Sequence, residues 1–301
     1  MDVSTPLLER LVERRILVPM GVDGLYGRSG IFESVVTGLE SAIARAGSAD
    51  EAEVLRFPPA MPRTEFERSE YMKSFPQLAG TVHAFCGGDR EHMALLTKLA
   101  TGEDWSRDHK PTELVLVPAA CYPLYPMLAM EGVIPGGGRL FDVQSYCFRH
   151  EPSADPARMQ FFRMREFVRV GTAGQALTFR DLWLLRAKTL ISNLELPFEI
   201  APANDPFFGR AGKLMKDNQL EQELKLELVI PVASAQPTAC LSFNYHQDHF
   251  SNIWQLTLAP GKSAHSACVG FGLERIVLAL FRHHGFEPGH WPAGVRHTLW
   301  G

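Results

Sequence analysis

Apolar residues recur at helical spacing in several parts of the chain. Between residues 32 and 46, for example, Val35, Leu39 and Ile43 lie every four positions, as on one face of an amphipathic helix. The segment 276–281 is apolar throughout, which predicts a buried helix. The predicted helices span residues 6–18, 32–46, 122–130, 177–194 and 276–281.

Shorter apolar runs, bounded by proline, glycine or polar residues, predict strands. They span residues 53–57, 114–118, 225–232, 239–244 and 253–258. Two longer runs, 141–149 and 161–170, flank the polar stretch 152–159 and predict a long antiparallel hairpin. Because helices and strands are mixed without an internal repeat, we expect one α+β domain over residues 1–301, built on an antiparallel sheet.

The charge balance argues against a nucleic-acid partner. The chain has 30 basic and 34 acidic residues, a formal net charge of -4, and no block rich in lysine or arginine. A nucleic-acid binder usually carries a concentrated positive patch. We therefore expect no tRNA partner.

The sequence offers no apolar run of membrane-spanning length and no apolar stretch near its start, so the cytoplasm is the default location. The five cysteines are odd in number and widely spaced, which does not predict a disulfide framework. An isolated cysteine is usually a small buried hydrophobe. This is the expectation for Cys86 and Cys147.

Two short segments carry candidate chemistry. Residues 148–151 read FRHE at the end of an aromatic run, and residues 270–275 read GFGLER at the start of a predicted helix. Each supplies an arginine, whose planar charged fork suits phosphate. In this order the segments resemble motifs 2 and 3 of class II aminoacyl-tRNA synthetases, most closely the zinc-containing seryl type. The resemblance implies a class II catalytic fold and ATP as a substrate.

The resemblance also implies a role for each residue at the ATP site. Arg149 would contact the α-phosphate and Arg275 the γ-phosphate. Glu151 would bind the adenine amino group, and Phe167 would stack on the adenine ring.

Two further residues complete the expected ATP site. Arg158, in the hairpin loop, would contact the γ-phosphate or pyrophosphate. Glu227 matches an acidic residue that lies near Mg²⁺ and the phosphates in seryl enzymes. Arg149, Arg275 and Glu227 are therefore the expected catalytic residues.

The same resemblance implies a zinc site that captures the amine of the substrate. Its ligands would be Cys121, Glu166 and Cys268. Two thiolates and one carboxylate suit Zn²⁺ and leave a fourth position open for the amine. Cys240 lies in a similar strand-like run and competes with Cys268 for the third position.

Seryl-tRNA synthetases carry a large N-terminal tRNA-binding region, whereas here the motif 1-like strand already begins at residue 53. The chain therefore resembles the bacterial amino acid:carrier protein ligases more closely. Those enzymes adenylate glycine or alanine and pass it to the phosphopantetheine thiol of a small acidic carrier protein. The resemblance implies a homodimer without a tRNA-binding domain.

Several residues remain open. Asp205 would contact the substrate amine, set the pocket floor or simply form a turn. Lys213 and Lys216 lie on a predicted helix that could face an acidic carrier. The polar residues between 244 and 249 could form a supporting hydrogen-bonded cluster: Asn244, His246, Asp248 and His249.

Two other functions fit the same motifs. One is a seryl-type synthetase whose tRNA arm is supplied by another chain, and the other is a non-catalytic regulatory paralogue. Nor does the sequence distinguish glycine from alanine or serine, since one methylene changes binding by only about 1–3 kcal/mol.

Overall fold

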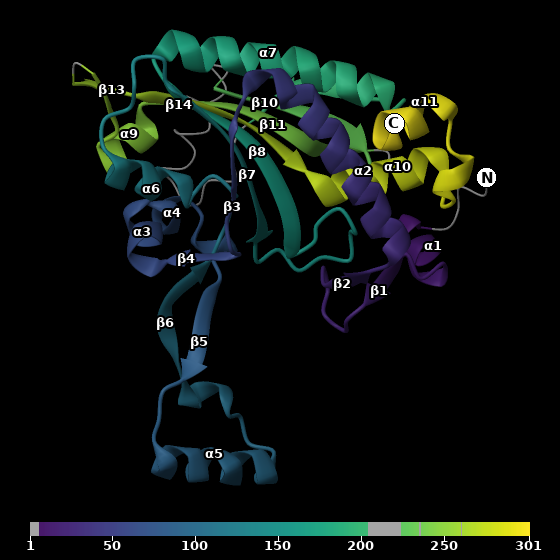
Figure 1. Ribbon diagram of the computed structural model, residues 1–301. Helices are drawn as coiled ribbons and strands as arrows, with labels where there is room; N and C mark the ends of the chain where they lie inside the picture. Colours follow the sequence, from purple (N-terminus) through teal and green to yellow (C-terminus); the bar gives the residue numbers. More distant parts are fainter. Residues whose placement is uncertain (1–5, 204–223, 235, 260) are drawn as a thin grey trace.

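The computed structural model describes residues 6–203, 224–234, 236–259 and 261–301. Its centre is a seven-stranded sheet in the order β3-β7-β8-β14-β11-β10-β9 (Figure 1). All neighbouring strands run antiparallel except the parallel pair β3 and β7. The strands are β3 (Glu53–Arg56), β7 (Arg139–Phe148), β8 (Phe161–Gly171), β9 (Glu199–Pro202), β10 (Lys225–Pro231), β11 (Pro237–Gln247) and β14 (His265–Gly272).

Helices cover both faces of this sheet and bury two separate cores. On one face, apolar side chains of α1 (Leu7–Glu13), α2 (Gly30–Gly47), α7 (Ala173–Asn193), α10 (Leu273–His284) and α11 (Ala293–Trp300) form the larger core. Smaller helices form the second core on the opposite face: α3 (Arg63–Arg68), α4 (Tyr71–Ser74), α6 (Leu124–Glu131) and α9 (His249–Trp254). Within the part of the chain that the structure describes, no helix is long and apolar enough to cross a membrane.

The predicted hairpin is confirmed as β7 and β8, whose register runs from Arg139 opposite Val170 to Phe148 opposite Phe161. A buried ion pair joins the two strands of this hairpin. Arg165 donates to Asp142 through Nε at 2.9 Å and Nη2 at 2.6 Å, and both side chains are almost fully buried.

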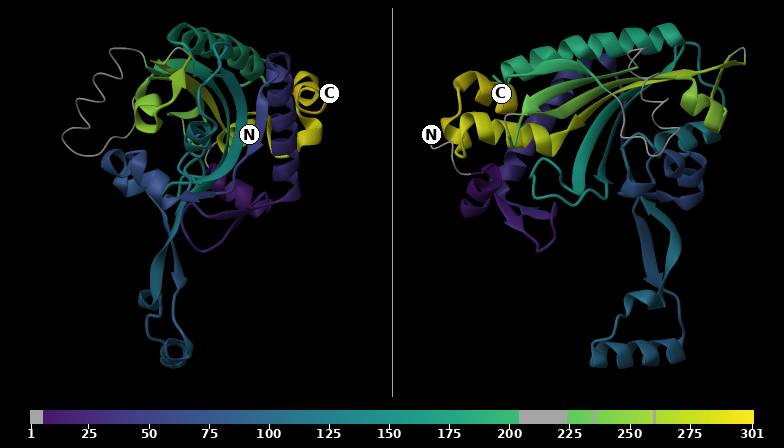
Figure 2. Two further views of the ribbon diagram at one scale, coloured as in Figure 1. Left: turned by 60° about the vertical axis from the view of Figure 1, so that its left-hand side comes forward. Right: turned by 180° about the vertical axis from the view of Figure 1, so that it is seen from behind.

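An arm projects from the body below β4 (Ala60–Pro62) and α3 in Figure 1, and its strand β6 (His109–Leu116) pairs with β4. It consists of β5 (Thr81–Phe85), α5 (Asp89–Thr101) and β6, with α5 at its tip (Figures 1 and 2). No residue of α5 is buried. The sequence analysis predicted only the end of β6 and missed the rest of this arm.

The remaining strands are short. They are β1 (Leu17–Pro19), β2 (Tyr26–Arg28), β12 (Thr257–Leu258) and β13 (Lys262–Ser263).

Three local predictions were wrong. The first helix ends at Glu13 because Arg15 adopts a positive φ of 53°, and the chain then enters β1. The predicted strand 253–258 contains the end of α9 and a left-handed Gln255 (φ 57°), so only β12 remains of it. Cys86 is exposed on the arm, whereas Cys147 is buried as expected.

Candidate active site

The sheet register places the key polar residues on one face. Directly paired residues of neighbouring strands point to the same side of a sheet. One row across four strands is Glu166, Gly270, Ser242 and Glu227. A second row, two positions away, is Val168, Cys268, Asn244 and Lys225. Apart from Val168, which is buried in the core, these residues form the floor of two adjoining pockets.

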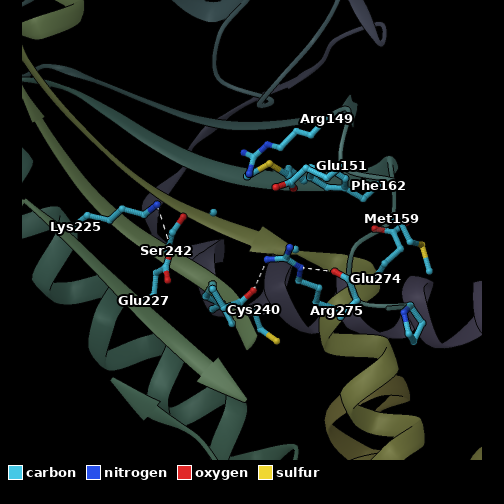
Figure 3. Close-up of a pocket in the computed structure, with 17 residues that line it drawn as sticks. Arg149, Glu151, Met159, Phe162, Lys225, Glu227, Cys240, Ser242, Glu274 and Arg275 are labelled. Carbon is cyan, nitrogen blue, oxygen red and sulfur yellow. Dashed lines mark hydrogen bonds and ion pairs between the residues drawn. The ribbon is translucent and has the colours of Figure 1, made fainter. Parts of the chain in front are cut away.

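The first pocket, here called the arginine pocket, contains both predicted phosphate-binding arginines (Figure 3). Arg149 follows β7; its Nε donates to the Pro118 carbonyl at 3.2 Å, and its guanidinium carbon lies 5.4 Å from the centroid of the Phe162 ring. Glu151 and Glu227 also line this pocket, and their roles toward adenine and Mg²⁺ stay predictions.

Arg275 enters the same pocket from the first turn of α10. Its Nε donates to the Ala157 carbonyl and its Nη1 to the Ala239 carbonyl, both at 2.8 Å. Burial lowers the pKa of Arg275, and repulsion by Arg149 and Arg158 acts in the same direction. A cluster of cations in a partly buried pocket favours an anionic ligand.

Glu274 fixes the orientation of the helix that carries Arg275. Its carboxylate accepts hydrogen bonds from the backbone nitrogen of Arg163 at 2.7 Å and from its Nε at 2.8 Å. Arg28 lies 3.3 Å from the same carboxylate. The GFGLER segment is thus tied to β8 by a glutamate that is 2% exposed.

Arg158 lies at the margin of the arginine pocket. Its side chain is 54% exposed, with Nη1 3.8 Å from Glu151 Oε1, and it is not among the residues that line the arginine pocket. Its neighbours Ala157 and Met159 do line it. The loop therefore reaches the pocket, while the predicted phosphate contact of Arg158 stays a prediction.

The prediction for Phe167 was wrong. Its ring is buried on the opposite face of the sheet, stacked on Trp183 of α7 with centroids 4.2 Å apart. Successive strand residues point to opposite faces, so Glu166 and Phe167 cannot both reach one pocket. Phe162 has the right parity and lines the arginine pocket instead.

The second pocket, here called the thiol pocket, brings together the three predicted zinc ligands, Cys121, Glu166 and Cys268. Cys121 comes from the loop before α6, and its backbone nitrogen donates to Glu166 Oε1 at 3.2 Å. Burial raises the pKa of Glu166 to about 8, and the nearby Cys268 adds to this shift.

The two thiols interact directly. Their hydrogen bond, together with burial, raises the pKa of Cys121 well above its usual value. The same bond lowers the pKa of Cys268 well below its usual value. Asn244 Nδ2 at 3.2 Å and His246 Nε2 at 3.5 Å also contact the Cys268 sulfur. The arrangement therefore favours a thiolate at Cys268.

The structure separates the competing cysteine from this group. Cys240 lines the arginine pocket, where burial raises its pKa to about 12. Among the described residues, no group of three or more His, Cys, Asp or Glu side chains is arranged to hold a metal ion. Zinc binding by Cys121, Glu166 and Cys268 therefore stays a prediction.

Of the polar cluster, Asn244, His246 and His249 line the thiol pocket, whereas Asp248 precedes α9 and does not. Asp205, Lys213 and Lys216 lie outside the described residues.

Sequence reasoning missed two polar residues of the floor, Lys225 and Ser242. Both lie two positions from a residue that the sequence analysis did name, Glu227 and Asn244 respectively. The period of two along a strand could therefore have found them.

Comparisons with known proteins identify relatives of the chain and structures of the same fold. No family model matches the chain. Amino acid–acyl-carrier-protein ligase 2 of Bradyrhizobium diazoefficiens is 47% identical over 281 residues, which cover 93% of this chain and 84% of the relative. Amino acid–acyl-carrier-protein ligase 1 of the same organism is 46% identical over 281 residues, which cover 93% of this chain and 86% of that relative. The type-2 serine–tRNA ligase of Methanopyrus kandleri is 29% identical over 60% of this chain and 37% of its own length.

Solved structures show the same fold. The seryl-tRNA synthetase of M. kandleri, in complex with A. aeolicus tRNASec, superposes with a TM-score of 0.83 at 21% identity, over 98% of this chain and 60% of that one. The seryl-tRNA synthetase of Pyrococcus horikoshii, complexed with ATP, gives 0.70 at 13% identity, over 98% and 62%. The predicted class II synthetase fold is confirmed. By its similarity to the two Bradyrhizobium relatives, the chain belongs to the amino acid–acyl-carrier-protein ligase family.

Proposed function

We propose that this chain activates a small amino acid as an aminoacyl-adenylate and transfers it to the phosphopantetheine thiol of a carrier protein. The observation that carries the proposal is the junction of an arginine-lined pocket with a pocket of two thiols and a carboxylate. The names of the two relatives supply the class of acceptor.

The arginine pocket suits ATP. In the first step a carboxylate oxygen of the amino acid bonds to the α-phosphorus, and pyrophosphate leaves with the electrons of the broken P–O bond. Arg149 and Arg275 offset the charge on the phosphates, which is the main demand of phosphoryl and nucleotidyl transfer. In the second step the carrier thiolate attacks the activated carbonyl, and AMP leaves. Neither step needs a nucleophile from the protein.

The thiol pocket suits the amine end of the substrate. Cys121, Glu166 and Cys268 would hold Zn²⁺, since two sulfurs and one oxygen are donors that this ion prefers. Bound there, the ion would serve as a Lewis acid that accepts the amine. Glu227 would hold Mg²⁺ beside the phosphates through its carboxylate.

The size of the substrate is part of the proposal. Tyr122 packs edge to face against Tyr71 and Phe250, with centroids 5.6 and 5.9 Å apart, and all three line the thiol pocket. Such a wall of large rings supports glycine, alanine or serine over a bulkier amino acid.

The oligomeric state and the acceptor are proposed from the family to which the chain belongs. We propose a homodimer, with the edge strand β3 and its exposed Val54 available to a second subunit. We propose a small acidic carrier protein as the acceptor, and no tRNA.

The first test is amino-acid-dependent ATP–pyrophosphate exchange across all twenty amino acids, with zinc-loaded protein. We expect exchange with glycine, alanine or serine, followed by thioester formation on a phosphopantetheinylated carrier protein. Charging of tRNA in place of the carrier would favour the synthetase alternative. Absence of exchange with every amino acid, from folded and zinc-loaded protein, would contradict adenylation.

Replacing Cys268 by serine should remove bound zinc, because the hard hydroxyl is a poor substitute for a thiolate ligand. Metal analysis of purified protein should find about one zinc per wild-type chain and below about a tenth of that in the variant, as a three-ligand site predicts. Cys86→Ser, on the exposed arm, is the matched control and should keep its zinc. Equal zinc in all three proteins would exclude this site.

A further inference from the structure

The two pockets meet at a small set of residues. Among the described residues, those that line both pockets are Arg149, Met164, Lys225 and Ser242. The proposed function places the phosphates of ATP in one pocket and the amine of the amino acid in the other. The carboxylate and the α-phosphorus must therefore react at this junction, and a charge there acts on the reacting atoms.

Two of the four residues carry a charge, and they approach from different parts of the sheet. Arg149 follows β7, whereas Lys225 is the first residue of β10, four strands further along the sheet order. Figure 3 shows the two side chains on separate elements that border the pocket. The junction thus lies between two cations, of which the sequence motifs account for Arg149 alone.

Lys225 is held in place by its surroundings. Its Nζ lies 3.1 Å from Glu227 Oε1, and its side chain is 11% exposed. Residues 225 and 227 share one face of β10 because strand side chains alternate. Lys225 lies opposite Asn244, which in turn lies opposite Cys268, so the three residues share one row across the sheet. A lysine this buried is usually paired, and Glu227 is a partner of Lys225 here.

We infer that Lys225 is a catalytic residue that binds the carboxylate of the amino acid and guides it to the α-phosphorus. The inference rests on the proposed function. Both reactants are anions, so an ammonium group between them reduces their repulsion. A carboxylate oxygen forms the new bond to phosphorus while the bond to the pyrophosphate oxygen breaks. Lys225 keeps its proton throughout, and Glu227 orients the ammonium group before substrate binds.

The test compares two ligands and two proteins. The ligands are the amino acid that gives the fastest exchange with wild-type protein and the amino alcohol with the same side chain, which lacks the carboxylate. Binding of each is measured by calorimetry in the presence of a non-hydrolysable ATP analogue. Lys225→Met should weaken binding of the amino acid about 10- to 100-fold, as the loss of a charged hydrogen-bond partner does. Binding of the amino alcohol should be unchanged.

Matched variants separate charge from shape. Lys225→Arg keeps the charge and should retain most of the preference for the amino acid. Lys225→Gln, a neutral polar variant, takes the place of Lys225→Met if that protein does not fold. Lys262→Met, at an exposed position of β13, should behave as wild type.

If Lys225→Met loses affinity equally for the amino acid and the amino alcohol, Lys225 only shapes the pocket. If it binds both ligands as tightly as wild type does, Lys225 does not contact the carboxylate. Either outcome overturns the inference. ATP–pyrophosphate exchange tests the proposed function separately. If wild-type protein shows no exchange with any amino acid, the proposed function is wrong. If Lys225→Met exchanges at the wild-type rate, only the role of Lys225 is wrong.

Discussion

Replacing Arg275 by methionine should slow amino-acid-dependent ATP–pyrophosphate exchange about 10²- to 10³-fold. Loss of one preorganised donor at a developing charge has an effect of this size. The Arg275 guanidinium is suited to this role because two carbonyl oxygens fix its Nε and Nη1. Within the described part of the chain, Nη2 makes no hydrogen bond and so can reach a phosphate oxygen.

Two variants make this prediction specific. Arg275→Lys keeps the charge but loses the fork, and should fall between wild type and Arg275→Met. Arg158→Met removes a half-exposed arginine at the pocket margin and should change the rate by less than about tenfold, because an exposed charge is screened by water. Similar losses for Arg158→Met and Arg275→Met would mean that the arginine pocket attracts ATP by charge alone. Circular dichroism should confirm that each variant is folded.

Replacing Arg165 by methionine should lower the free energy of unfolding by about 3–5 kcal/mol, the usual effect of removing one partner of a buried ion pair. Among the ion pairs of the described residues, the Asp142 carboxylate would keep the two longer contacts to Arg56, both at 3.4 Å. Urea denaturation followed by circular dichroism measures the loss.

The control for this variant is Arg56→Met. Arg56 contacts the same carboxylate, but its side chain is 43% exposed, and such pairs contribute below about 1 kcal/mol. Arg165 also donates to the Glu40 carbonyl at 2.6 Å, which ties β8 to α2. If both variants lost equal stability, burial of the Arg165–Asp142 pair would not be what stabilises the hairpin.

The predictable parts of the fold are those with long regular patterns. The β7–β8 hairpin and helices α2, α7 and α10 were predicted because each has long runs of apolar residues, and these residues are buried in the two cores. The helix of the arm was missed although Met93, Leu96 and Leu99 recur at helical spacing. All three are exposed, so in α5 this spacing does not mark a buried face.

The residues of the site can be divided in the same way. Arg149 and Arg275 were predicted from short motifs, and the Cys121–Glu166–Cys268 group from the resemblance to a family; the structure places each set in one pocket. Phe167 was assigned to the wrong face because the two-residue period of β8 was not applied. Lys225 was missed although the period of two along β10 places it on the same face as Glu227. Only its pairing opposite Asn244 depends on a contact between strands that the local sequence does not encode.

The arm described above bears on how this sequence can vary. Because α5 places no residue in either core, substitutions at Met93, Leu96 or Leu99 leave the packing of both cores intact. Exposed segments of this kind tolerate insertion and deletion far better than the strands that carry a site. Length differences among related chains should therefore gather between residues 86 and 108, while the strands that form the pocket floor keep a fixed length.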